Sequence, residues 1–306
     1  MISASHRRIF GGLALVTLAA CGAPRPQASP VPATAIPVAT AAATSGPPWL
    51  LLDAAVAPEV RQAVQAWASQ TGLEVREADL RQAERQPPGD LWGVVGEEES
   101  LASLPAAWSG GSIVRVVVDP VRLASDARTS TLGPEVAEDE AGFLMGAAAG
   151  LATGTGLVGV VGAGQGEAWR EGFEEGLRYS CPKCRLDTLA GPSQAGFGTD
   201  VVAVAPGTAV EAEGTAPWLV VFDDPAFAAA GGRVAARVRK APEGIVAPAL
   251  GRLWGGASGE AWAFSVEDGG LVTEVDAQAI SPGRERLLRE AEQNLAAGWL
   301  TVGGGG

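Results

Sequence analysis

The chain has 306 residues, with 22 Lys and Arg against 35 Asp and Glu, giving a formal net charge of −13 at pH 7. Its length favours two domains or lobes over one, and an apolar content of 47% is enough for a sizeable core. The acidic balance excludes broad nucleic-acid binding, which needs clustered cations. The one histidine, His6, lies in a predicted leader. A mature chain without histidine cannot build Ser-His-Asp or Cys-His catalysis or an imidazole metal site.

Residues 1–20 have the organisation of a secretory signal peptide. Arg7 and Arg8 precede an apolar run from Ile9 to Ala20, which is too short to cross a bilayer. The run ends in Ala19-Ala20-Cys21-Gly22, which resembles the lipobox of bacterial lipoproteins, where the Cys is acylated and becomes the new N-terminus. An ordinary signal peptide followed by a chance Cys is the alternative. We expect a lipid on Cys21 that holds the protein, extracytoplasmic, on the cell membrane.

A tether follows the lipidated cysteine. Residues 21–48 are almost entirely Ala, Pro, Thr, Ser and Val, with Arg25 as the one charge. This composition shows neither helical nor strand periodicity and is typical of an extended spacer. We expect the globular part to begin at residue 49.

Apolar strands alternate with amphipathic helices beyond the tether. The expected strands lie at 49–52, 73–75, 91–95, 113–118, 157–161, 201–204 and 219–222. Helices are expected at about 58–72, 136–152 and 282–297, and a further one carries Trp169, Phe173 and Leu177 at four-residue steps. This alternation predicts parallel sheets covered on both faces, with ligands bound beyond the carboxyl ends of the strands. The residues that follow such ends are Asp53, Asp119, Gly162, Gly207 and Asp223.

Two glycine-rich segments are candidate loops for binding a nucleotide cofactor. Gly154–Gly159 satisfies G-x-G-x-x-G but precedes its strand, whereas a dinucleotide loop must follow a strand and open a helix. The loop Gly162–Gly166 is better placed, but Glu167 stands where the third glycine belongs and would repel a pyrophosphate. We therefore expect no cofactor. The second loop still suits backbone contacts with a smaller polar ligand, because glycine permits close approach.

Cys181-Pro182-Lys183-Cys184 is a C-x-x-C motif. Zinc needs about four ligands, and the mature chain holds no other Cys or His beyond the acylated residue, so no metal site is expected. Outside the cell a dithiol tends to oxidise, which predicts a local structural disulfide between Cys181 and Cys184, with redox exchange as the alternative.

Asp223 and Lys240 are candidate ligand-binding residues. Asp223 and Asp224 are neighbours at a strand end, where consecutive side chains point to opposite sides, so one can enter a cleft while the other meets solvent. Lys240 is one of only two lysines in a chain that otherwise uses Arg, which suggests a need for a compact ammonium. Chance usage on a solvated face is the alternative for Lys240.

Several segments, in order and spacing, resemble one family of lipoproteins. They are Glu140–Leu151, Thr155–Gly162, Trp169–Gly176, Thr199–Gly207, Val221–Asp223, Ala236–Lys240 and Ala291–Val302. Together they cover roughly residues 135–302 and are similar to the central and C-terminal signature of the basic membrane protein (Bmp) family. That family comprises purine-nucleoside-receptor-like lipoproteins that supply ABC importers.

The resemblance implies an α/β protein with the type I periplasmic-binding-protein fold: two doubly wound lobes with parallel sheets and a ligand cleft between them. Residues 49–135 would form a shortened first lobe and 136–302 the second, with part of about 241–280 returning to the first and 303–306 a frayed tail. By the resemblance, Asp223 would accept hydrogen bonds from ligand hydroxyls and Lys240 would donate to the same region. Asp119 would read a base edge, and Gly162 and Gly207 would lie at the cleft floor.

The expected function is that of the solute-binding component of an ABC importer, without catalysis. Its partners would be a small polar solute, most simply a nucleoside, the permease with its ATPase, and the membrane through Cys21; nucleic acid is not expected, and the protein is expected to be a monomer. One departure from the family matters: Asp53 is followed by Ala-Ala-Val-Ala-Pro, without the family's Phe and Asn that supply an aromatic face to the base. The alternative is therefore a sensory or regulatory lipoprotein of the same fold with a diverged pocket.

Overall fold

The computed structural model describes residues 48–82, 90–104, 108, 114–118, 129–162, 164, 166–196, 198–208, 217–223 and 233–303. The chain separates into two units, Met1–Ala43 and Thr44–Gly306, and all described residues belong to the second. The predicted signal peptide, Cys21, the tether up to residue 47, Asp119, Asp224 and the last three residues of the tail lie outside the described residues. None of the helices in the described part is long and apolar enough to cross a bilayer.

The first sheet has six strands, all parallel, in the order β11-β5-β4-β3-β1-β2. The strands are β1 (Trp49–Asp53), β2 (Glu74–Ala78), β3 (Leu91–Glu97), β4 (Val114–Val118), β5 (Thr129–Val136) and β11 (Ala261–Phe264). Alternation along β1 directs Leu50 and Leu52 into one core and Trp49 and Leu51 into another, so both faces of this sheet are buried.

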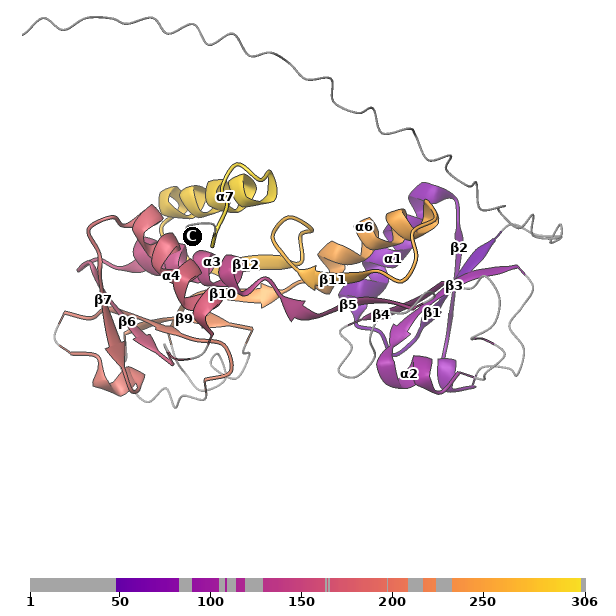
Figure 1. Ribbon diagram of the computed structural model, residues 1–306, viewed down its shortest axis with the longest axis horizontal. Helices are drawn as coiled ribbons and strands as arrows, with labels where there is room; N and C mark the ends of the chain where they lie inside the picture. The colour runs from indigo at the N-terminus through magenta and orange to yellow at the C-terminus, as the bar shows by residue number, and fades with distance from the viewer. Residues whose placement is uncertain are drawn as a thin grey trace, which may run out of the picture. The chain divides into compact units, whose positions relative to one another are not determined.

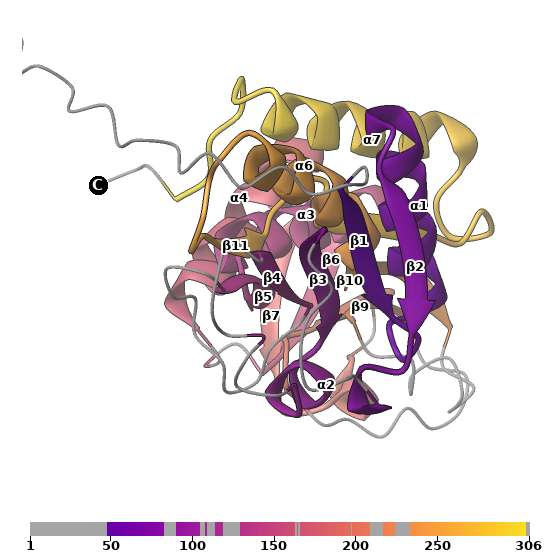
Figure 2. The same cartoon turned by 90° about the vertical axis from the view of Figure 1, so that its right-hand side faces the viewer.

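Helices from distant parts of the chain cover the first sheet. On the Leu50 face, α1 (Pro58–Thr71) packs against α6 (Pro242–Trp254), and the two helices lie side by side (Figure 2). Three tryptophans join them to the sheet: the ring of Trp67 lies 5.8 Å from that of Trp92, and Trp92 lies 5.0 Å from Trp254. On the other face, Leu80 of the 3-10 turn η1 (Leu80–Gln82) and Leu101 of α2 (Glu98–Ala102) complete a smaller core.

The second sheet also has six strands, in the order β12-β10-β9-β8-β6-β7. They are β6 (Leu157–Val161), β7 (Arg185–Leu189), β8 (Val201–Val204), β9 (Trp218–Phe222), β10 (Val234–Lys240) and β12 (Leu271–Val275). Only β12 runs antiparallel to its neighbour, β10. A 3-10 turn, η3 (Pro192–Gln194), follows β7. The helices α3 (Glu138–Ala152), α4 (Glu167–Ser180) and α7 (Pro282–Ala296) bury their apolar residues in the core on one face of this sheet (Figure 1).

Glycines bring α3 and α4 into backbone contact. A Cβ on Gly142, Gly146 or Gly176 would lie 2.1, 2.0 or 2.0 Å from the carbonyl oxygen of Trp169, Phe173 or Phe143, in that order. These distances leave no room for a methyl group, so the four-residue spacing of glycine sets how closely the helices approach. The expected apolar stripe of α4 is buried against this contact: Trp169, Phe173 and Leu177 are all at most 4% exposed.

The chain passes three times between the sheets: from β5 to α3, from β10 to α6, and from β11 to β12. Backbone hydrogen bonds tie the crossings together, from Ala137 N to Phe264 O (3.0 Å) and from Ala241 N to Gly270 O (2.8 Å). The helix predicted at about 136–152 is α3, which begins two residues later, at Glu138, because Val136 still pairs with Phe264 of β11.

Candidate functional site

The carboxyl edge of the second sheet gathers three of the predicted ligand-binding residues. Val161, the last residue of β6, is paired with Val204, the last of β8, and Ala205 N donates to Val161 O at 3.0 Å. Gly162 and Gly207 follow these two ends, and Asp223 follows the end of β9. Parallel neighbours therefore bring one candidate residue each to the same edge.

Gly162 is required by a close contact between loops. Its φ of +79° is in the left-handed region, and a Cβ would lie 2.1 Å from Thr208 Oγ1. The Thr208 hydroxyl is buried and has no hydrogen-bond partner in the described part of the chain. Gly207 has φ +71° but is exposed with open space around it, so it serves the turn and not the contact.

Asp223 has an unusual backbone. Among the described residues it is the one non-glycine with positive φ, at +40°. Its backbone N donates to Val238 O on β10 at 2.7 Å, which fixes the turn. Its Oδ1 lies 3.8 Å from a guanidinium nitrogen of Arg237, and both side chains are partly exposed. Unfavourable backbone geometry held by neighbouring structure is a feature of binding and catalytic sites.

Charged side chains continue from Asp223 along one face of β10. Arg237 also lies 3.8 Å from Glu274 on β12, and Glu274 is bonded at 2.7 Å by Arg239. Burial alone would lower the pKa of Arg239, but its hydrogen bonds to Glu274 and Glu243 outweigh burial and raise that pKa. Sequence reasoning did not single out Arg237. Arg237 and Arg239 are two residues apart, and this spacing could have placed both side chains on one face of a strand.

Lys240 lies where β10 leaves the second sheet. Alternation along the strand places it on the face opposite Arg237 and Arg239. Its Nζ is 5.2 Å from the centre of the Phe264 ring, which belongs to β11 in the first sheet. Lys240 is thus a residue of the crossing segments, one strand along from Asp223.

Glu140 links α3 to the third crossing. Its Oε2 accepts a 2.7 Å hydrogen bond from Val266 N, in the loop between β11 and β12. Burial is the largest cause of a raised Glu140 pKa, and the carboxylates of Asp139, Glu267 and Asp268 raise it further, while the bond from Val266 lowers it. Glu140 appears in the family-like segments but was not predicted to have this role.

The first sheet contributes Asp53, at the carboxyl end of β1. This carboxylate is 1% exposed; Oδ1 accepts from Ala55 N at 3.2 Å, and Oδ2 has no hydrogen-bond partner among the described residues. A buried carboxylate oxygen without a partner is costly, so it marks a place where a ligand donor would be stabilising.

Cys181 and Cys184 are joined by a disulfide directly after α4. The bridge closes a tight turn, in which Cys184 N also donates to Cys181 O at 2.9 Å. It lies at the amino end of β7, away from the carboxyl edge that holds Asp223.

Comparison with solved structures identifies the fold. An ABC transporter solute-binding protein from Conexibacter woesei aligns over 84% of this chain and 98% of its own, with a TM-score of 0.52 and 13% identity. A solute-binding protein from Aeropyrum pernix aligns over 84% of this chain and 93% of its own, with a TM-score of 0.44 and 14% identity. A transcriptional activator of the comK gene from Bacillus halodurans aligns over 83% of this chain and 99% of its own, with a TM-score of 0.47 and 12% identity. No protein-family model and no curated protein sequence matches the chain.

The two mainly parallel sheets, the three crossings and the Conexibacter similarity define the type I periplasmic-binding-protein fold, as predicted.

Proposed function

We propose that this protein is the solute-binding component of an ABC importer, held outside the cell membrane by a lipid on Cys21. It would bind a small polar solute, for which the resemblance to the Bmp family favours a nucleoside, and pass it to a permease driven by an ATPase. The protein would catalyse no reaction.

The observation that carries the proposal is the strained Asp223 at the end of β9, on the same sheet edge as the Gly162–Thr208 contact. A carboxylate there can accept two hydrogen bonds from neighbouring hydroxyls of a ribose or sugar, and charge-assisted bonds of this kind are about twice as strong as neutral ones. The Thr208 hydroxyl, which lacks a protein partner among the described residues, would supply a further contact.

Lys240 would donate to the same ligand region from the crossing, and Asp53 and Asp119 would contribute from the strand ends of the first sheet. The bound form would be the one in which both sets of residues contact the solute. Because a ligand shifts an equilibrium only through different affinities for two states, these contacts would favour the closed form that the permease recognises.

The test is thermal unfolding of the protein with a panel of nucleosides, sugars and amino acids. A ligand that binds only the folded state adds about 2.7 kcal/mol at a hundredfold excess over its Kd. We expect a midpoint shift with nucleosides that Asp223→Ala abolishes, whereas Asp187→Ala, an exposed carboxylate on β7, leaves it intact. A midpoint shift with another class of solute alone would support the transport role and would rule out a nucleoside as the ligand.

A second function is favoured by the Arg237 guanidinium near Asp223. This ion pair already occupies part of the carboxylate that a ligand would use. A sensory or regulatory lipoprotein whose pocket has diverged would keep the fold and satisfy Asp223 internally. Absence of any shift across the panel, in a folded protein, would support this function over transport.

A further inference from the structure

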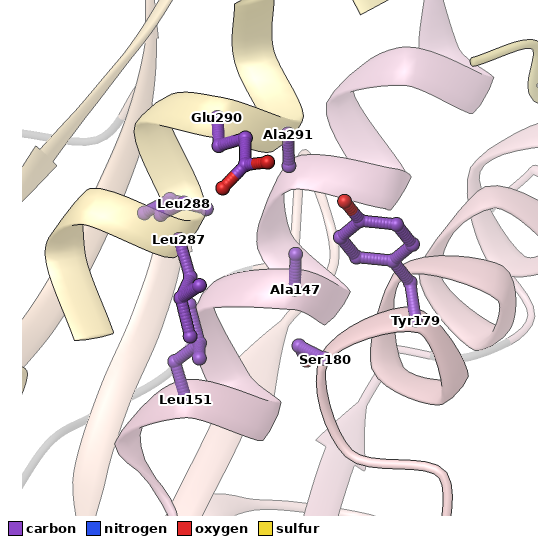
Figure 3. A pocket seen from close by; sticks show the side chains of 8 residues that line it. All are labelled: Ala147, Leu151, Tyr179, Ser180, Leu287, Leu288, Glu290 and Ala291. Atoms are coloured by element: carbon purple, nitrogen blue, oxygen red, sulfur yellow. The ribbon is translucent and has the colours of Figure 1, made fainter. Parts of the chain in front are cut away.

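A pocket lies between α3, α4 and α7, on helices that cover the second sheet. It has a volume of about 260 Å³ and is lined by Ala147, Leu151, Tyr179, Ser180, Leu287, Leu288, Glu290 and Ala291 (Figure 3). None of these residues belongs to the carboxyl-edge site, so the pocket is independent of the proposed transport function.

The packing of the helices explains why the pocket is open. Glycines draw α4 against the backbone of α3, whereas α7 is held by buried side chains and by Arg284, which donates to Leu151 O at 2.7 Å. Ala147 and Ala291 are both 1% exposed and line the floor from α3 and α7. Their short side chains leave the intervening space unfilled.

The rim of the pocket is apolar yet exposed. Tyr179 is 46% and Leu287 52% exposed, although both are large apolar side chains. The Tyr179 ring packs against Phe143, whose ring centre lies 5.5 Å away. Figure 3 shows the Glu290 carboxylate and the Tyr179 ring facing the same space.

An aromatic face, a carboxylate and an apolar floor together suit an organic cation. The ring attracts a cation through its quadrupole, and the carboxylate attracts the same charge. The net charge of −13 raises the concentration of cations around the protein. An engineered apolar cavity of about 150 Å³ holds benzene, so 260 Å³ has room for an aromatic ring with a short chain.

We propose that this pocket binds an amphiphilic organic ammonium ion, with its apolar body on Ala147 and Ala291 and its charge between Tyr179 and Glu290. Tyr179 is the one tyrosine of the chain, which gives the site its own probe. Replacing it with 3-fluorotyrosine yields a single ¹⁹F resonance that reports on this pocket alone.

The experiment is a titration of the fluorinated intact protein with 2-phenylethylammonium, and with 2-phenylethanol as its neutral counterpart. We expect a saturable shift with the amine and about tenfold weaker binding of the alcohol. Glu290→Gln should remove this preference, while Glu171→Gln, an equal loss of charge on the exposed side of α4, should keep it. Asp223→Ala should leave the titration unchanged, which separates this site from the proposed solute site.

Two further variants test the position of the ligand. Ala147→Leu fills the floor and should abolish the shift; Leu287→Ser alters only an exposed rim residue, so it should fold normally and weaken amine binding. The proposal would be overturned by no saturable shift with the amine, by equal affinity for amine and alcohol, or by loss of the preference in Glu171→Gln.

Discussion

Substitution of Gly146 by alanine tests whether backbone contact between α3 and α4 sets the packing of the second sheet's helices. A Cβ at this position would lie 2.0 Å from Phe173 O, 2.8 Å from Leu177 N and 2.9 Å from Phe173 C. All three atoms belong to the backbone of α4, so no side-chain rotation relieves the clash. The helices must separate by about 1.5 Å to reach ordinary contact distances.

Opposing effects decide the magnitude. Overpacking of a core costs about 3 kcal/mol at the upper end of its usual range, and the backbone clash places Gly146 there. Alanine recovers about 1 kcal/mol because it favours the helix more than glycine does. We therefore expect Gly146→Ala to lower the free energy of unfolding by about 2 kcal/mol, or the midpoint by roughly 4–8 °C for a chain of this size.

Gly251 is the matched control. It also lies inside a helix, α6, but is exposed, and a Cβ there would meet only Trp67 Nε1 at 3.8 Å. Gly251→Ala should therefore raise the free energy of unfolding by up to about 1 kcal/mol. Urea unfolding followed by circular dichroism measures both variants. A Gly146→Ala protein as stable as the wild type, or more stable, would refute the packing argument.

Three other substitutions give separate outcomes. Burial and neighbouring carboxylates raise the pKa of Glu140 above 4.5 in the folded protein, so its contribution to stability is present below pH 4.5 and is lost as pH rises through the folded pKa. Glu140→Gln should therefore reduce the fall of the unfolding free energy with pH, measured by unfolding curves from pH 4 to 8. The pKa of Asp200 shifts in the opposite direction: burial raises it, but hydrogen bonds from Thr153, Gly154 and Thr155 outweigh burial and lower it below 3.8. Asp200→Ala should therefore lower the free energy of unfolding by about 1–3 kcal/mol at pH 7. The difference from the wild type should shrink as acid protonates Asp200. Replacing Cys181 and Cys184 with serine should lower stability by only about 2 kcal/mol in chemical denaturation, because the closed loop is short; cooperative unfolding lost altogether would contradict this.

Local periodicity was sufficient to predict the elements that bury one clear stripe. Trp169, Phe173 and Leu177 predicted α4, and the β-branched run before residue 118 predicted β4. β10 was not predicted as a strand, because its sequence VAARVRK mixes apolar and basic residues whose alternation is stabilised by partners on β9 and β12. β7 was not predicted as a strand either, because four of its five residues are exposed and it therefore lacks an apolar pattern.

The candidate site divides in the same way. Strand ends could be located from the sequence, which is why Asp223 and Gly162 were found. The contact between Asp223 and Arg237 depends on the register of β9 against β10, where Arg237 is paired with Val221. Neither residue type nor spacing encodes that register. The Gly162–Thr208 contact likewise requires two loops that only the fold brings together.

The first sheet is assembled from two separate stretches of chain, and this has a consequence for the order of folding. Its edge strand β11 and its covering helix α6 come after β6, β7, β8, β9 and β10 of the second sheet have been synthesised. Until residue 254 is available, the apolar side of α1, with Val60, Val64 and Trp67, lacks part of its cover. The second sheet in turn waits for α7, which ends at Ala296. A nascent chain therefore has no contiguous segment that can complete either lobe early, and cutting it between them would yield two fragments that each lack part of a core.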